Sequence, residues 1–147
     1  MGPATPSEKT VLAAVAGILA ERSTTMDRHW NGAIAGTDPE ELHDLRVNAR
    51  RVQAALRIFR DILPKKSRKH ADRLKRLIRL MGDTRELDVF LASLDERRPS
   101  IAGDLRALEL LAARVAQERE DRHRALVRAL RQSTWNADFR RFLEELT

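Results

Sequence analysis

The chain has 147 residues, of which 42% are hydrophobic, so it is long enough for one domain with a substantial core. It has no Cys, six Gly, five Pro, a formal net charge of +6 and a sequence pI near 10.6. This composition excludes a disulfide framework and a thiolate metal site, favours an all-α fold, and indicates attraction to polyanions such as nucleic acid, anionic lipid or phosphate polymers. We therefore predict a single helical domain over residues 1–147.

The N-terminal segment 1–7 contains two prolines and is expected to be a disordered lead. It lacks the basic-then-apolar order of a secretory signal, and the longest apolar run, 11–20, is too short to span a bilayer. We expect no membrane association and, by default, a cytoplasmic location. Ser7 is predicted to cap a first helix that runs from about Glu8 to Ile34 and ends at Gly36. Its inward stripe is predicted at Val11, Leu12, Val15, Ile18 and Leu19.

A strong start signal opens the second predicted helix. Asp38-Pro39 places an N-cap carboxylate before a proline at the first helical position, and Glu41 stands three residues after the cap, as a capping box requires. The helix is predicted to run from Pro39 to about Leu63, before Pro64. Its buried flank is predicted at Leu45, Ala49, Val52, Leu56, Phe59 and Leu63, and its opposite flank carries His43, Arg46, Arg50, Gln53 and Arg57.

The remaining chain is also predicted to be helical. A third helix should run from about Lys66 to Met81, antiparallel to the second because the connection is short. Gly82-Asp83-Thr84 is predicted as a break or kink, followed by a helix through about Glu96. Ser100 is a cap candidate for a long helix from Ile101 to about Arg131, and Ser133-Thr134 should cap a last helix from Trp135 to Leu146. The expected architecture is an antiparallel bundle of long helices.

Positive charge is concentrated between His43 and Arg85. This segment holds fourteen Lys or Arg and four Asp, a net charge of +10, while the rest of the chain carries −4. Arg68, Lys75 and Arg79 lie on the polar side of the third helix, so the cationic faces of the second and third helices can border one groove. Because a row of like charges is mildly destabilising, it indicates that an anionic ligand is the missing partner.

The same residues form a recognisable pattern. It consists of His43-x-x-Arg46-Val47-x-x-Arg50-Arg51, Leu56-x-x-Phe59, Leu74-Lys75-x-Leu77-x-Arg79-x-x-Gly82 and Arg85-x-x-Asp88-Val89. The pattern resembles the CHAD family of histidine-bearing α-helical domains over roughly residues 40–94, inside a basic motif region of 39–96. The resemblance implies a half-domain of the four-helix-bundle type that binds inorganic polyphosphate in a basic groove, without catalysis, a cofactor or a metal. The residues that it implies for binding are His43, Arg46, Arg50, Arg51, Lys75, Arg79 and Arg85.

The resemblance also implies partners. Family members are found at polyphosphate granules or beside a triphosphatase-type domain. The family domain resembles two related helical halves, and this chain is long enough for one, so we expect a homodimer that rebuilds the full surface. Gln53 stands where the family commonly has arginine and Glu86 where it commonly has aspartate, so the ligand row is one cation poorer.

The residue types suit a phosphate polymer. Arginines spaced one helical turn apart offer repeated forked donors to phosphate oxygens. Binding should weaken steeply with salt, as it does for nucleic acids. Because a bound polyanion favours the protonated form of His43, we expect tighter binding at mildly acid pH.

Alternative functions follow from the charge alone. A nucleic-acid or general polyanion binder is one alternative, although the only aromatic residue of the basic segment, Phe59, is predicted on the buried face. A phosphohydrolase is another, although no nucleophile motif or phosphate loop is present.

Several residues are predicted to have structural roles. The pairs Glu40-x-x-His43 and Glu120-x-x-His123 have metal-site spacing, but both histidines stand among arginines, so no metal site is predicted. His29, His70 and His123 are predicted at the surface, Asp44 and Asp88 are predicted to pair with nearby arginines, and Arg57 and Arg60 are predicted to serve solubility.

Overall fold

The computed structural model describes residues 6–97 and 103–147, and the regular structure in those ranges is entirely helical. The prediction of an all-α bundle is therefore confirmed. The helices are α1 (Glu8–Asp27), α2 (Trp30–Ala35), α3 (Pro39–Ile58), α4 (Ser67–Arg97), α5 (Leu105–Gln132) and α6 (Trp135–Glu145).

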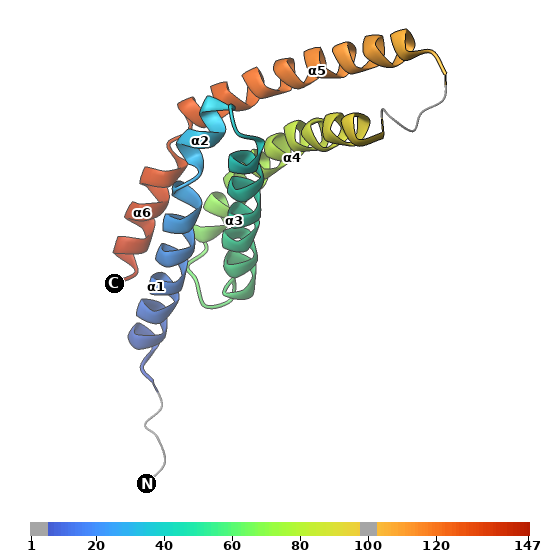
Figure 1. Cartoon of the computed structure of the whole chain (residues 1–147). Coiled ribbons are helices and arrows are strands. Elements are labelled where there is room, and N and C mark those ends of the chain that lie inside the picture. Colours follow the sequence, from blue (N-terminus) through green and yellow to red (C-terminus); the bar gives the residue numbers. More distant parts are fainter. Residues whose placement is uncertain (1–5, 98–102) are drawn as a thin grey trace.

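The helices form a bundle from which one hairpin projects (Figure 1). Helix α3 packs between α1 and α4, while α6 lies beside α1 and also contacts α4. The second part of α4 and the first part of α5 continue away from this bundle, packed against each other. We call this hairpin, residues 86–97 and 105–119, the α4–α5 arm. None of the helices, over the residues described, is long and apolar enough to cross a membrane.

The core lies where the bundle helices meet. Large apolar side chains from five of the helices converge there almost without solvent exposure, which is the burial that drives folding of such a chain. These side chains are Leu19, Met26, Leu45, Val52, Leu74, Met81, Leu126, Leu130, Trp135 and Phe139. The predicted buried flank of α3 is confirmed, since Leu45, Ala49, Val52 and Leu56 are buried.

The predicted first helix is divided in two. Its start is confirmed, because the Ser7 hydroxyl accepts a hydrogen bond from the Thr10 amide. However, α1 ends at Asp27, and the chain turns before α2 begins at Trp30. The His29 ring lies 3.0 Å from a carboxylate oxygen of Glu41 on α3, which fixes the turn through a tertiary contact. The prediction that Ile18 faces inward is wrong, since its side chain is 43% exposed.

The start of α3 follows the prediction and its end does not. Asp38 accepts a hydrogen bond from the Glu40 amide at 2.9 Å, and Pro39 is the first helical residue. Glu41 does not close a capping box, since its carboxylate engages His29. The helix ends at Ile58, and turns carry the chain on to Leu63.

Helix α4 continues through Gly82-Asp83-Thr84, where a break or kink was predicted, so no break occurs there. Thr84 is fully buried, and its hydroxyl donates to the Leu80 carbonyl one turn earlier at 3.5 Å. Packing against α5 and α3 keeps this stretch helical against its local propensity. The predicted cap Ser100 lies outside the described residues, whereas Asp104 caps α5 by accepting from the Arg106 amide at 2.9 Å.

Polar contacts fasten α6 to the first turns of α4. The Trp135 indole donates to the His70 carbonyl at 2.9 Å, and Arg73 pairs with Asp138 at 2.8 Å. Lys66 pairs with Glu145 as well. Two cations of the basic segment, Lys66 and Arg73, are therefore neutralised by α6 and hold the bundle together.

Candidate functional site

A groove of about 710 Å³ runs between α3 and α4. One wall comes from the end of α3 and the turn after it, and the other from the first turns of α4. Apolar side chains of both helices lie between the walls, and charged side chains rise on either side. The lining residues are Gln53, Leu56, Arg57, Arg60, Ser67, Arg68, Ala71, Asp72 and Lys75.

The two walls can be followed beyond the lining residues because the helices are antiparallel. At the other end of the pair, Arg46 of α3 lies across α4 at Gly82, where a Cβ on the glycine would come 3.4 Å from Arg46 Nε. That Nε atom is buried and has no hydrogen-bond partner among the described residues. The Arg46 side chain therefore reaches across to α4 at Gly82, at the end of the helix pair that lies away from the connection between the two helices.

Two exposed cations lie between these ends. Arg50 is one turn after Arg46 and one turn before Gln53, so helical spacing places it on the α3 ridge of the groove. Arg79 is one turn after Lys75 and one turn before Gly82, so it occupies the matching position on α4. Helical spacing thus places Arg50 and Arg79 between the contact of Arg46 with Gly82 and the groove that Lys75 lines.

These four cations are not neutralised by the protein. Over residues 6–97 and 103–147, no carboxylate forms an ion pair with any of them. Arg57 and Arg68 are likewise without an ion pair in that part of the chain. Arg60 approaches Asp61 at 3.9 Å, but both side chains are largely exposed, so the pair is weak. Three of these six unpaired cations, Arg57, Arg68 and Lys75, line the groove, and the other three lie further along the two helices.

His43 and Arg85 lie at the N-terminal end of α3, in a different electrostatic environment. Arg85 faces Glu40 at 3.8 Å and donates to the Pro39 carbonyl at 3.5 Å. The side-chain ligand atoms of Glu40, His43 and Asp44 lie within 4.8 Å of one another. This cluster comes from adjacent turns of one helix, with the Arg85 charge beside it. Glu40 and Asp44 therefore stand beside the two cations at this end, although the Arg85–Glu40 pair is weak because Glu40 is 67% exposed.

Arg51 is the predicted binding residue that helical geometry separates from the groove. It is exposed, and it projects about 140° around α3 from Arg46. Conversely, Arg57, Arg60 and Arg68 line the groove although the sequence assigned Arg57 and Arg60 to solubility. Arg57 lies four residues after Gln53, Arg60 lies three residues after Arg57, and Arg68 lies seven residues before Lys75. This helical spacing was the signal that could have identified them.

The predicted surface positions of the other histidines are corrected by the structure. His29 is half-buried against Glu41, and His70 is half-buried against the rings of Phe139 and Phe142, with centroid distances of 5.7 and 4.9 Å. His123 is buried against Gly36 at the end of α2. Burial lowers the pKa of both His70 and His123, and the neighbouring charges of Arg73 and Arg119, respectively, lower these pKa values further.

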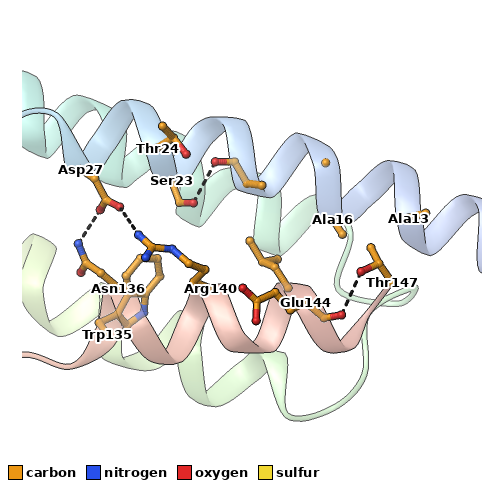
Figure 2. A pocket seen from close by; sticks show the side chains of 13 residues that line it. Ala13, Ala16, Ser23, Thr24, Asp27, Trp135, Asn136, Arg140, Glu144 and Thr147 are labelled. Carbon is orange, nitrogen blue, oxygen red and sulfur yellow. Dashed lines mark hydrogen bonds and ion pairs between the residues drawn. The ribbon is translucent and has the colours of Figure 1, made fainter.

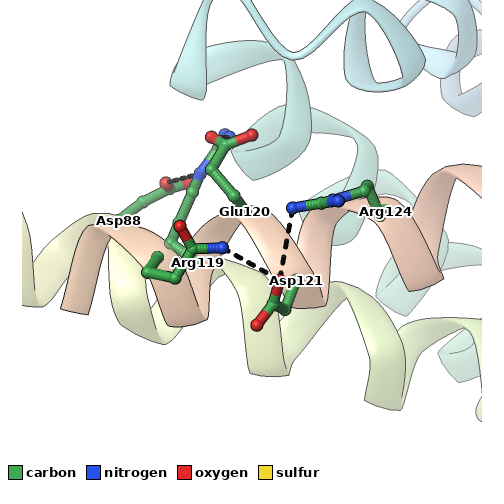
Figure 3. A network of polar contacts seen from close by, with 6 residues as sticks. Asp88, Arg119, Glu120, Asp121 and Arg124 are labelled. Carbon is green, nitrogen blue, oxygen red and sulfur yellow. Dashed lines mark hydrogen bonds and ion pairs between the residues drawn. The ribbon is translucent and has the colours of Figure 1, made fainter. Parts of the chain in front are cut away.

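The two aspartates that were predicted to be structural behave differently. Asp88 accepts from Arg119 Nε at 2.8 Å across the α4–α5 arm, and both side chains are nearly buried (Figure 3). Arg119 also pairs with Glu120 at 2.9 Å, and Asp121 with Arg124 at 3.3 Å. Asp44 has no ion pair among the described residues, so the prediction holds for Asp88 and fails for Asp44.

A second cavity, of about 320 Å³, lies between α1 and α6 (Figure 2). Its α1 wall is built from small residues such as Ala13, Ala16 and Gly17. At one end, Asp27 accepts from Asn136 at 2.5 Å and faces Arg140 at 3.9 Å, and burial raises the pKa of Asp27. Its arginine already faces a carboxylate, so this cavity does not resemble a polyanion site.

Comparisons with known proteins give one match. A family model described as CHAD domain matches residues 17–147, which is nearly the whole chain. Neither the curated proteins nor the solved structures contain a match.

Proposed function

Because the chain belongs to the CHAD family, a family associated with polyphosphate binding, we propose that it binds inorganic polyphosphate in the groove between α3 and α4. The observation that carries this proposal is the pair of ridges with unpaired cations. Arg46 and Arg50 stand on one ridge, and Lys75 and Arg79 stand on the other. His43 and Arg85 would contact the polymer at the end of the groove where Glu40 lies, and Arg51 would contribute only long-range attraction.

The physical basis is charge compensation. Four or more cations held close together without carboxylate partners repel one another, and a phosphate polymer relieves that repulsion. Each guanidinium can donate two parallel hydrogen bonds to phosphate oxygens, and the ammonium of Lys75 acts as a point charge. A flexible polymer without bases or sugars needs no further recognition elements.

We further propose that the protein holds the polymer without cleaving it. The groove lining offers cations and one carboxylate, Asp72, but no nucleophile paired with a base. Incubation with polyphosphate and with tripolyphosphate, with and without Mg²⁺, is therefore expected to release no phosphate. Release above the buffer control would replace this proposal with a phosphohydrolase function.

The test of binding is a titration with long-chain polyphosphate at fixed ionic strength. We expect Arg50→Ala and Lys75→Ala each to weaken binding severalfold while helicity stays unchanged, because both side chains are exposed and unpaired. Arg128→Ala is the matched control, since this exposed arginine lies on α5, away from the groove. Equal affinities for all three variants would contradict the proposed site. Displacement of polyphosphate by duplex DNA at equal phosphate concentration would favour a general polyanion binder.

We also propose that two copies associate through the α4–α5 arm. Its two helices leave apolar side chains uncovered: Val89 and Phe90 are 52% and 44% exposed, and Leu110 and Leu111 are 65% and 45% exposed. Family membership supports the further proposals that the protein works in the cytoplasm, at polyphosphate granules or beside a triphosphatase-type domain.

A further inference from the structure

On the premise that the groove binds polyphosphate, we infer that Arg57, Arg60 and Arg68 form an extension of the site that engages long chains and gives the protein a preference for them over short ones. These residues lie outside the family motif that the sequence carries. They stand at the end of the groove nearest the α3–α4 connection.

The placement of the three arginines supports this extension. Arg57 is in the last turn of α3, Arg60 follows the helix, and Arg68 is in the first turn of α4. All three line the same groove as Lys75. A polymer that leaves Arg50 and Lys75 in this direction therefore meets three more cations, on both walls, without leaving the groove.

The distribution of acidic groups also favours this end. Among the described residues, Asp72 is the one carboxylate in the groove lining, and it forms no ion pair. The opposite end has Glu40 and Asp44 beside His43, and Glu40 faces Arg85. A polyanion gains more from cations that have no internal partner, so additional phosphates are bound more favourably toward Arg57 and Arg68.

The length over which the cations extend along the two helices explains the preference for long chains. The Cα atoms of Arg46 and Arg57 are eleven residues apart on one helix, a span of about 16 Å, and Arg68 and Arg79 are equally far apart on the other. A triphosphate is too short to bridge this span. It can occupy either the centre of the groove or its extension, whereas a long chain contacts both.

The experiment compares affinities for tripolyphosphate and for long-chain polyphosphate in three proteins. These are the wild type, the extension variant Arg57→Ala/Arg60→Ala/Arg68→Ala, and the control variant Arg22→Ala/Arg128→Ala/Arg131→Ala. The control removes the same charge from exposed positions outside the groove. Circular dichroism verifies that all three are equally helical.

The extension variant is expected to lose at least about tenfold in affinity for the long chain and to keep its tripolyphosphate affinity within about twofold of the control. For the long chain, the slope of log affinity against log salt concentration should also become shallower by about two to three units in this variant. If the extension variant and the control bind the long chain equally, the extension is refuted and the proposed function stands. An equal loss for both ligands would refute chain-length selectivity. Failure of the wild type to bind either ligand would instead refute the proposed function.

Discussion

Two glycines lie in contrasting environments, and the contrast predicts opposite effects of adding a methyl group. Gly36 ends α2 with φ of +67°, and a Cβ there would collide with the His123 ring. Gly82 lies inside α4, where a Cβ would make an ordinary contact with Arg46 at 3.4 Å. The first position needs glycine, whereas the second tolerates alanine.

We expect Gly36→Ala to lower the free energy of unfolding by about 1–3 kcal/mol, because it forces a side chain into left-handed backbone and displaces His123. Gly82→Ala should raise that free energy by up to about 1 kcal/mol, because alanine has the higher helix propensity. Urea denaturation of both variants measures the difference. A loss of stability in Gly82→Ala equal to that in Gly36→Ala would mean that the Arg46 side chain cannot accommodate the added methyl group.

The two histidines with lowered pKa values predict how stability depends on pH. His70 is packed against aromatic rings near Arg73, and His123 is packed at the end of α2 near Arg119. Because their pKa values in the folded state lie below 6.5, the value for an unperturbed histidine, the unfolded chain takes up protons first as the pH falls. The stabilisation is therefore complete above about pH 6.5 and is lost progressively below it.

Chemical denaturation at about pH 7.5 and about pH 5.5 should show this loss of stability. The double variant His70→Gln/His123→Gln should depend less on pH over the same interval, because glutamine keeps a polar group and cannot be protonated. An unchanged pH dependence in this variant would assign the effect to other groups.

At the level of helices, the ion pair between Asp88 and Arg119 holds the α4–α5 arm together. The side chains are 6% and 12% exposed, and Asp88 Oδ2 has no further hydrogen-bond partner among the described residues. Contact with Asp88 and Glu120 raises the pKa of Arg119 despite the opposing effect of burial. The arm therefore relies on a polar contact near its base, where α4 and α5 leave the bundle.

Arg119→Ala is expected to cost about 3–5 kcal/mol, because it leaves the Asp88 carboxylate buried without its partner. Arg119→Met should cost less if the site accepts an apolar side chain of similar length. Hydrogen exchange should localise the loss of protection to residues 86–97 and 105–119. Uniform loss of protection across the bundle would show that the arm and the core unfold as one unit.

Local signals in the sequence predicted the helix starts well. Ser7 and Asp38 are N-caps, and Gly36 is a C-cap, because each acts on backbone groups within three or four residues. The turn before Trp30 could not be predicted, because no glycine or proline marks it and it depends on His29 meeting Glu41 twelve residues later. The predicted break at Gly82 failed for the converse reason, since tertiary packing of Thr84 overrides a weak local preference.

The candidate site was predictable in part. Helical spacing alone placed Arg46 and Arg50 on one row, and the short connection placed Lys75 and Arg79 opposite them. The sequence could not reveal that Arg85 would face Glu40, because that contact joins residues far apart in the chain. The same spacing placed Arg57 and Arg68 on the two cationic faces, but it could not show that the groove lies at their end of the helix pair.

For the molecule as a whole, the exposed apolar residues of the arm predict self-association. Light scattering over a range of concentrations should give the mass of a dimer, and Phe90→Glu, which adds charge to the exposed face, should shift the mass to that of a monomer. Glu21→Lys, a charge change at an exposed position on α1 outside the arm, is the control. A monomer at all concentrations would show that this face is covered by something other than a second copy.

Helix α4 forms a wall of the groove with its first half and the arm with its second half. It has 31 residues without a break, so it is a strut about 46 Å long. A polymer running along the groove contacts only the first half of this helix, whereas the second half projects from the bundle in the α4–α5 arm and adds to the space that each copy occupies (Figure 1). We therefore expect that, at saturation, the spacing of the copies bound along one long polyphosphate chain is set by the length of α4. The segment of polymer that each copy contacts is shorter than this spacing.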